Sequence, residues 1–264
     1  MILLSQANFG MMHIPKCAGS SLRAQFREGN ELERDFLGTR EVPGYGPMVG
    51  HHLPLAILQE CYPDVIERLS RVRRYAIIRE PGDRFRSAMS QWIRTALDKE
   101  PSQMRPSEIA DEAFRVIDLL NGPGPRSRIE SVVFFPQADY VFLNGDRFID
   151  NLYRFEALDV LARDLAERHG LQFRPESAWN QTVTYRVPGL TSQIKSLRHF
   201  ASTRLPRGAY VALRDVAVKV LARKGTPALT EGLATNRDVE AFLKHYYAQD
   251  FDLYAAIASK PVPA

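Results

Sequence analysis

Two apolar runs, each followed by a turn and then by a helical pattern, give the first indication of the fold. Residues 8–14 are mostly apolar, and a helical pattern covers 19–28 after a short turn. Residues 73–79 are apolar in their middle and end in Arg79, and a second helical pattern covers 83–98. Such patterns predict a buried strand, a tight loop and a helix, repeated along the chain.

The remaining pattern predicts further helices and a few short strands. Helices are expected at 55–70, 107–120, 156–169, 209–224 and 238–247. Short strands are expected at 138–143 and 147–154, around the turn signal Asn144-Gly145, and loops at 29–49 and 121–128. Strands that alternate with helices predict an α/β fold, with a mostly parallel central sheet flanked by helices and a helical C-terminal region.

The turn after the first strand has the composition of a phosphate-binding loop. Small residues let the backbone approach an anion, and the first N–H groups of the following helix are unpaired and partly positive. Lys16 adds a full charge, and Ser20 and Ser21 can donate from their hydroxyls. We therefore expect a phosphate to bind this loop, which reads Pro15-Lys16-Cys17-Ala18-Gly19-Ser20-Ser21.

The loop differs from the Walker loop of nucleotide hydrolases. There, Lys directly precedes a Ser or Thr that holds magnesium, whereas Lys16 stands early in this loop and Gly-Lys-Ser/Thr occurs nowhere in the chain. The loop is therefore expected to bind a phosphate ester without a metal ion. A plain strand-to-helix turn with a surface lysine is the alternative. Cys17 is either a reactive thiol near a helix N-terminus or a small residue that fills the loop.

Arg79 and Ser87 form a second candidate anion site. Arg79 ends the second strand, and Ser87 lies eight positions later on the following helix. The guanidinium fork suits phosphate oxygens, and ligands of parallel sheets bind at the carboxyl ends of strands, where Lys16 is also expected. The alternative is that Arg79 pairs with Glu80 or Asp83 on the surface.

Charge is unevenly distributed along the chain. Its net charge is +4, and nine basic residues but a single acidic one lie between 181 and 224. We expect one domain over 1–264, with 181–235 as a basic, helical insertion. Such a segment attracts a phosphorylated cofactor, an acidic glycan or lipid headgroups, or it is simply a solvated helical face. No nucleic-acid motif accompanies the charge, so nucleic acid is not expected as a partner.

Other global features place the chain among cytoplasmic proteins. No apolar run reaches the length of a membrane helix, and the N-terminus does not resemble a secretion signal. The two cysteines form no disulfide framework, and no Cys/His cluster has metal-ligand spacing. We therefore expect a cytoplasmic protein, in contact with a membrane surface at most.

The two motifs together resemble those of sulfotransferases that use 3′-phosphoadenosine 5′-phosphosulfate (PAPS). Residues 13–22 are similar to the 5′-phosphosulfate loop of that family, and Arg79 with Ser87 is similar to its 3′-phosphate motif. The likeness is greatest to carbohydrate sulfotransferases such as heparan sulfate 2-O-sulfotransferase and its bacterial relatives, in which a Gly-His element precedes the second motif, as Gly50-His51 does here. Weaker similarities occur at Gln137 with Tyr140, at 154–156, at Asn180 and at 250–254.

The resemblance implies a P-loop-type three-layer fold and in-line transfer of a sulfuryl group from PAPS to an acceptor hydroxyl, expected on a carbohydrate, with no metal required. Residues 15–21, Arg79 and Ser87 would bind PAPS. Lys16 would neutralise the leaving group, and His51 would take the proton of the acceptor, with His52 as the alternative.

The chain departs from the family pattern in the loop. The family usually has Thr-Gly-Gly-Thr where this chain has Cys17-Ala18-Gly19-Ser20, and alanine tolerates a positive φ less well than glycine. Two other classes compete with a sulfotransferase: a nucleotide or small-molecule kinase with a divergent phosphate loop, and a non-catalytic module that binds anions. The lack of Gly-Lys-Ser/Thr counts against the kinase, and the presence of His51 with Arg79 and Ser87 counts against the binding module.

Overall fold

A four-stranded sheet forms the centre of the molecule. The computed structural model describes residues 1–122, 131–175, 183–185, 222–224, 227–234 and 236–258. The strand order is β1-β2-β5-β8, with β1 antiparallel to β2 and the other neighbours parallel. The strands are β1 (Ile2–Leu4), β2 (Phe9–Met12), β5 (Arg73–Ile78) and β8 (Asn151–Arg154). The predicted α/β fold with a mostly parallel sheet is confirmed.

The two central strands explain why the sequence shows continuous apolar runs. All four residues of β2 and the last four of β5 are buried, because helices cover both faces of the sheet. In the register of the sheet, Met12 lies opposite Ala76, and Ile78 lies opposite Arg154. The carboxyl ends of β2, β5 and β8 therefore meet at one edge.

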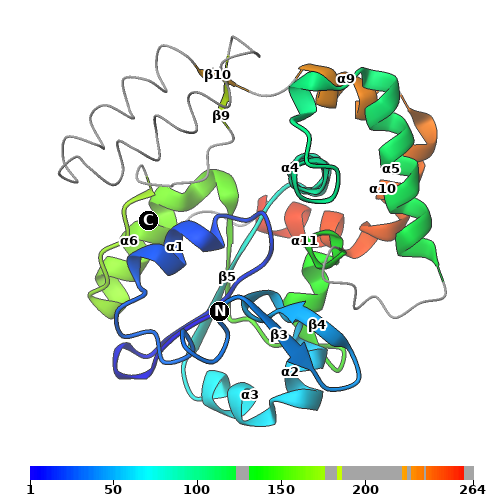
Figure 1. Cartoon of the computed structure of the whole chain (residues 1–264). Helices are drawn as coiled ribbons and strands as arrows, with labels where there is room; N and C mark the ends of the chain where they lie inside the picture. The colour runs from blue at the N-terminus through cyan, green and yellow to red at the C-terminus, as the bar shows by residue number, and fades with distance from the viewer. Residues whose placement is uncertain (123–130, 176–182, 186–221, 225–226, 235, 259–264) are drawn as a thin grey trace, which may run out of the picture.

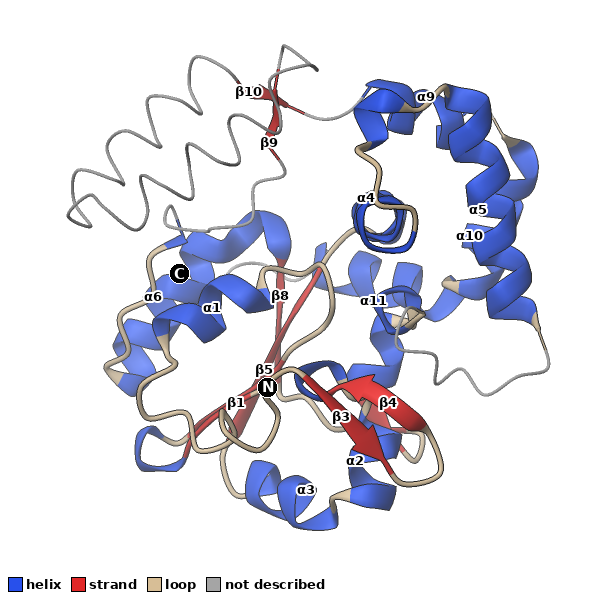
Figure 2. Ribbon diagram, viewed as in Figure 1, coloured by secondary structure: helices blue, strands red, loops and turns tan. Residues whose placement is uncertain are grey.

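Helices lie on both sides of this sheet, as Figures 1 and 2 show. The helices α1 (Gly19–Gln25) and α6 (Leu158–His169) lie on one side, and α2 (Leu55–Cys61) and α11 (Ala248–Ala258) on the other. The helix α3 (Pro63–Ser70) contacts β5. Gly170 ends α6 in the left-handed conformation at a φ of 66°, which glycine adopts without strain.

A second group of helices packs beside the sheet. The helix α4 (Pro81–Ala96) follows β5 and contacts α9 (Pro227–Ala234), which also packs on α5 (Pro106–Asn121) and α10 (Arg237–Tyr246). A Cβ at Gly232 of α9 would lie 2.5 Å from the carbonyl oxygen of Pro106, so only glycine allows this close contact. The expected helical C-terminal region is confirmed over the described part of 227–258.

The structure corrects several predicted elements. The predicted loop 29–49 contains a hairpin of β3 (Thr39–Val42) and β4 (Gly46–Val49). The predicted helix 55–70 is two helices that break at Tyr62, because the residue before a proline avoids helical backbone. The Asn144-Gly145 turn is confirmed, but it joins only the two-residue strands β6 (Phe142–Leu143) and β7 (Asp146–Arg147).

Short 3₁₀ helices complete the fold. They cover Ser5–Ala7, Gly50–His52, Pro101–Gln103, Val132–Phe134, Gln137–Tyr140 and Phe155–Ala157. Residues 138–140 are thus helical and not extended as predicted. The strand β8 begins only at Asn151 and belongs to the central sheet, because it pairs with β5 rather than with the hairpin.

Most of the basic segment lies outside the described residues, as do Asn180 and the predicted helix over 209–221. The described parts of 181–235 are the helix α9 and the strands β9 (Val183–Tyr185) and β10 (Ala222–Lys224), which form an antiparallel pair. The last three residues of the predicted helix 209–224 are therefore a strand. Within the described chain, no helix combines the length and the apolar character that a bilayer crossing requires.

Candidate anion-binding site

Three cationic side chains stand where three neighbouring parallel strands end. Lys16 follows β2, Arg79 comes directly after β5, and Arg154 is the last residue of β8. Because the strands are parallel, all three residues lie at the same edge of the sheet. A ligand at this edge would meet positive charge from three separate segments, which favours an anion.

The backbone of residues 15–21, which we call the anion loop, makes a tight turn into α1. Lys16 and Ala18 have positive φ values of 68° and 64°. The Cys17 N–H donates to the Ile14 carbonyl at 3.4 Å, and no described side chain caps α1. The Ser21 N–H donates to the Ala18 carbonyl at 3.0 Å, so among the first helical residues the N–H groups of Gly19 and Ser20 remain available to a ligand.

His13 explains why the loop needs glycine at position 19. A Cβ on Gly19 would lie 1.9 Å from Cδ2 of His13, so the imidazole ring packs directly against the backbone of the loop. Ser21 is buried, and its hydroxyl has no hydrogen-bond partner among the described residues. Ser20 is exposed. The two serines that the sequence suggested thus differ, and only Ser20 reaches the surface.

Lys16 connects the anion loop to α4. Its Nζ donates to Oε1 of Gln91 at 3.0 Å. Burial, together with the nearby charges of Arg94 and Arg79, lowers the pKa of Lys16 to about 8. Ser87 and Gln91 are one turn apart on α4, so the Lys16–Gln91 bond brings the face of α4 that carries Ser87 toward the loop. Lys16 and Arg79 therefore lie close together, and Ser87 lies one turn from the α4 residue that Lys16 contacts.

The surface ion pair considered for Arg79 is not formed. Glu80 instead caps α4, since its carboxylate accepts from the N–H groups of Gly82 and Asp83 at 3.0 and 2.6 Å. Asp83 pairs with Arg86. The Arg79 guanidinium lies over the Phe155 ring, 4.7 Å from its centre, and its buried Nε has no partner among the described side chains. The head group of Arg79 thus retains capacity for a ligand.

Gln137 links the anion loop to the end of β5. Its Oε1 accepts from the Arg79 N–H at 2.9 Å and from the Cys17 thiol at 3.3 Å, and its Nε2 donates to the Arg79 carbonyl at 2.9 Å. Burial raises the pKa of Cys17 to about 12, so the thiol is protonated and unreactive near neutral pH. The side chain of Cys17 therefore faces Gln137 rather than a ligand.

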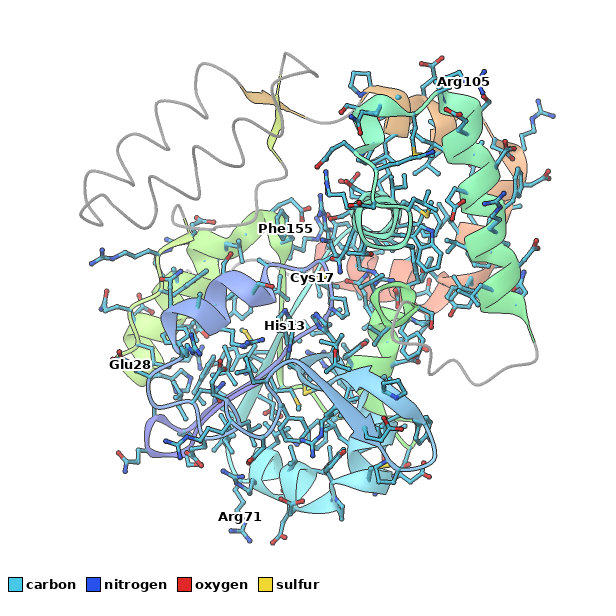
Figure 3. All side chains as sticks on the ribbon, in the orientation of Figure 1. His13, Cys17, Glu28, Arg71, Arg105 and Phe155 are labelled. Carbon is cyan, nitrogen blue, oxygen red and sulfur yellow. The ribbon has the colours of Figure 1, made fainter. Side chains whose placement is uncertain are left out.

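The helix α11 holds the turn that carries Gln137. Asp250 of α11 is fully buried, and its carboxylate accepts from the N–H groups of Gln137 and Ala138 at 2.8 and 2.9 Å. Arg84 of α4, also fully buried, places NH2 3.9 Å from the same carboxylate. Figure 3 labels Cys17 and Phe155, which lie between α1 and α4 in that view.

Two of the weaker sequence similarities meet beside Arg79. The guanidinium of Arg154 donates to the Tyr254 carbonyl at 3.0 Å and lies 4.0 Å from the centre of the Tyr254 ring. The Tyr254 hydroxyl donates to Glu156 at 3.1 Å. Residues 154–156 and 250–254 are far apart in the chain, yet they form one wall next to the Phe155 ring that supports Arg79.

Three histidines gather behind the anion loop. The ring centre of His13 lies 5.0 Å from that of His51 and 4.4 Å from that of His52. Burial lowers the pKa of His51 to about 3 and that of the other two well below the usual value, so all three rings are neutral at pH 7. Figure 3 labels His13, which lies below Cys17 in that view.

The histidine cluster was not evident in the sequence, because its members come from two separate segments. One nitrogen from each ring lies within 4.8 Å of the others, a spacing that could hold a metal ion. The positively charged side chains that act on these rings are those of Arg23 and Lys16. This positive surrounding favours an anion or a neutral hydroxyl over a cation.

The two rings of the Gly50-His51-His52 turn are held differently. Nδ1 of His52 lies 3.2 Å from the His13 carbonyl, which can only accept, so Nδ1 carries the proton and Nε2 the lone pair. The Tyr140 hydroxyl donates to the His52 carbonyl at 2.9 Å. His51 interacts with the Phe36 backbone, and its buried Nδ1 has no described partner.

Sequence reasoning missed Gln91 and Arg94, which both act on Lys16. The signal was present, because Ser87, Gln91 and Arg94 recur at helical spacing on one face of α4.

No protein-family model matches this chain, and neither a curated protein nor a solved structure shows significant similarity to it.

Proposed function

We propose that this protein is a sulfotransferase that moves a sulfuryl group from PAPS to an acceptor hydroxyl, expected on a carbohydrate. The observation that supports this most is the convergence of Lys16 and Arg79 at one sheet edge, near enough for the charge of Arg79 to lower the pKa of Lys16. Two anion-binding ends at one sheet edge suit a nucleotide with phosphates at both its 3′ and 5′ positions. The strand-loop-helix order also supports a P-loop-type fold.

In this proposal each end of the site has its own task. The N–H groups that begin α1 and the charge of Lys16 hold the 5′-phosphosulfate, while Arg79 and Ser87 hold the 3′-phosphate. The oxygen of the acceptor attacks sulfur, and the bond from sulfur to the bridging 5′-phosphate oxygen breaks. Lys16 stabilises the charge that develops on that oxygen, and adenosine 3′,5′-bisphosphate leaves.

A neutral histidine beside Lys16 would accept the proton of the acceptor. The role of His51 stays a prediction of the family resemblance. The contacts lead us to propose His52 instead, because its Nδ1–H is held by a carbonyl, its Nε2 has the lone pair, and the charge of Lys16 acts on it. Phosphate and sulfonate groups in the site would raise its pKa toward the range of an effective base.

The proposal is tested first by ligand binding. Thermal-shift and calorimetric titrations should compare adenosine 3′,5′-bisphosphate, adenosine 5′-monophosphate and ATP with magnesium. We expect the bisphosphate to bind most tightly and to stabilise the fold most. Stabilisation by ATP with magnesium alone would instead identify the kinase, and equal weak binding of all three would leave only a general anion-binding module.

Sulfuryl transfer is tested with labelled PAPS and a panel of neutral and acidic carbohydrates. Once an acceptor is found, His52→Gln should lose transfer while it keeps its affinity for the bisphosphate. His51→Gln is the matched variant from the next position, and we expect it to retain transfer. The opposite result would return the role of base to His51.

A further inference from the structure

The side chain of Gln137 touches both ends of the candidate site. Its amide closes two hydrogen bonds with the backbone of Arg79, one to the N–H and one to the carbonyl, each at 2.9 Å. The same oxygen accepts from the Cys17 thiol in the middle of the anion loop. The amide thus pairs with the end of β5 as the backbone of another strand would. It also accepts a hydrogen bond from the loop that carries Lys16.

Gln137 is itself held by the side chain of Asp250 in α11. Its N–H donates to Asp250, which is fully buried in α11 and faces the buried guanidinium of Arg84 at 3.9 Å. A buried charge of this kind is retained only where several hydrogen bonds satisfy it. Here those bonds come from the turn that presents Gln137, so α11 sets the position of Gln137.

We propose that Gln137, held by Asp250, is a positioning residue that sets the distance between the two anion-binding ends, so that one nucleotide engages both at once. This inference rests on the proposed function. Gln137 does not touch the ligand in this scheme; it orders the backbone of Arg79 and the loop of Lys16. A ligand with two phosphates depends on that spacing, whereas a ligand with one phosphate does not.

The test compares three ligands in the full chain: adenosine 3′,5′-bisphosphate, adenosine 5′-monophosphate and adenosine 3′-monophosphate. For Gln137→Ala we expect the affinity for the bisphosphate to fall by about tenfold or more. The affinity of this variant for each monophosphate should fall much less. A variant that was merely less folded would lose affinity for all three ligands by the same factor, and that uniform loss would overturn the proposal, as would no loss at all.

Cys17 offers a milder test that leaves Gln137 in place. Cys17→Ala removes the bond between the loop and the amide, whereas Cys17→Ser keeps a hydroxyl to donate. We expect the alanine variant to lose affinity for the bisphosphate by about two- to tenfold, the range for one hydrogen bond, and the serine variant to restore it. Equal affinities in both variants would contradict the proposed link.

Tyr75→Phe is the matched control, because it removes a hydrogen bond to His169 from the same strand β5 but away from the site. It should leave the preference for the bisphosphate unchanged. If the unmodified protein shows no such preference, the proposed function fails rather than the role of Gln137. If it does, and Gln137→Ala keeps the preference, the proposed function stands and the role of Gln137 is wrong.

Discussion

The two ends of the candidate site are both helix starts, yet they offer different chemistry. At α1 no described side chain caps the helix, so backbone N–H groups face a potential ligand beside Lys16. At α4 the Glu80 carboxylate already occupies the first N–H groups. A phosphate at the α1 end can therefore use the backbone, whereas one at the α4 end must rely on side chains such as Arg79 and Ser87.

The two ends also differ in the permanence of their charge. Lys16 is partly buried beside other cations, and its pKa of about 8 lies within the range that a binding experiment can reach. The guanidinium of Arg79 stays charged at any such pH. The charge at the loop end therefore changes with pH, and this end also uses backbone N–H groups. The arginine end supplies a charge that does not change with pH. This contrast tells us which substitution should affect which phosphate.

The largest expected effect separates the two ends by ligand. Arg79→Ala should weaken binding of adenosine 3′,5′-bisphosphate by about 1.5–3 kcal/mol, the value of a charged hydrogen bond, and should leave adenosine 5′-monophosphate almost unaffected. Lys16→Ala should weaken the binding of adenosine 3′,5′-bisphosphate and of adenosine 5′-monophosphate, but it should leave the binding of adenosine 3′-monophosphate unchanged. Isothermal titration calorimetry measures each case, with the exposed Arg71→Ala as a control for general charge. Equal losses for both monophosphates in either variant would show that the ends are not distinct.

A smaller effect should appear as a pH dependence of the loop end. A bound anion favours the protonated form of Lys16 and raises its pKa above the value of about 8 in the free protein. Affinity for adenosine 5′-monophosphate should therefore be constant below that pH and fall above it, by up to about tenfold per pH unit.

Lys16→Arg tests the origin of this dependence, because arginine keeps its charge over the same range. Titrations from pH 6.5 to about 9.5 should lose their slope in this variant. A slope that persists in Lys16→Arg would assign the titration to another group.

The smallest expected effect concerns the strain of the loop. Ala18 has a φ of 64°, which costs an alanine about 1–2 kcal/mol, whereas glycine adopts it freely. Because glycine also loses more entropy on folding, Ala18→Gly should raise the free energy of unfolding by only about 0.5–1 kcal/mol. Urea denaturation measures this change. The same substitution at the exposed helical Ala24 should instead lower stability, and a loss at both positions would contradict the strained loop.

The sequence predicted those parts of the site that depend on local order. The buried strands, the turn at Lys16, the position of Arg79 and the mostly parallel sheet all follow from apolar runs with abrupt ends. The positive φ considered for Ala18 is also found. These features are readable because a strand and its following helix are neighbours in the sequence.

What the sequence did not predict depends on distant packing. The contact of Lys16 with Gln91, and that of Cys17 with Gln137, joins segments far apart in the chain. Gln137 and the segment that begins at Asp250 were noted only as weak similarities, and no periodicity could show that they bond to each other. The proposed choice between His51 and His52 likewise depends on ring contacts that adjacent positions in a sequence cannot distinguish.

The most direct test of the account is a crystal structure of the protein with adenosine 3′,5′-bisphosphate. We expect the 5′-phosphate on the anion loop, within hydrogen-bond distance of Lys16 and the first N–H groups of α1. The 3′-phosphate should contact Arg79 and Ser87. A nucleotide bound elsewhere, or one with its two phosphates reversed, would contradict the claim that one ligand spans the two strand ends.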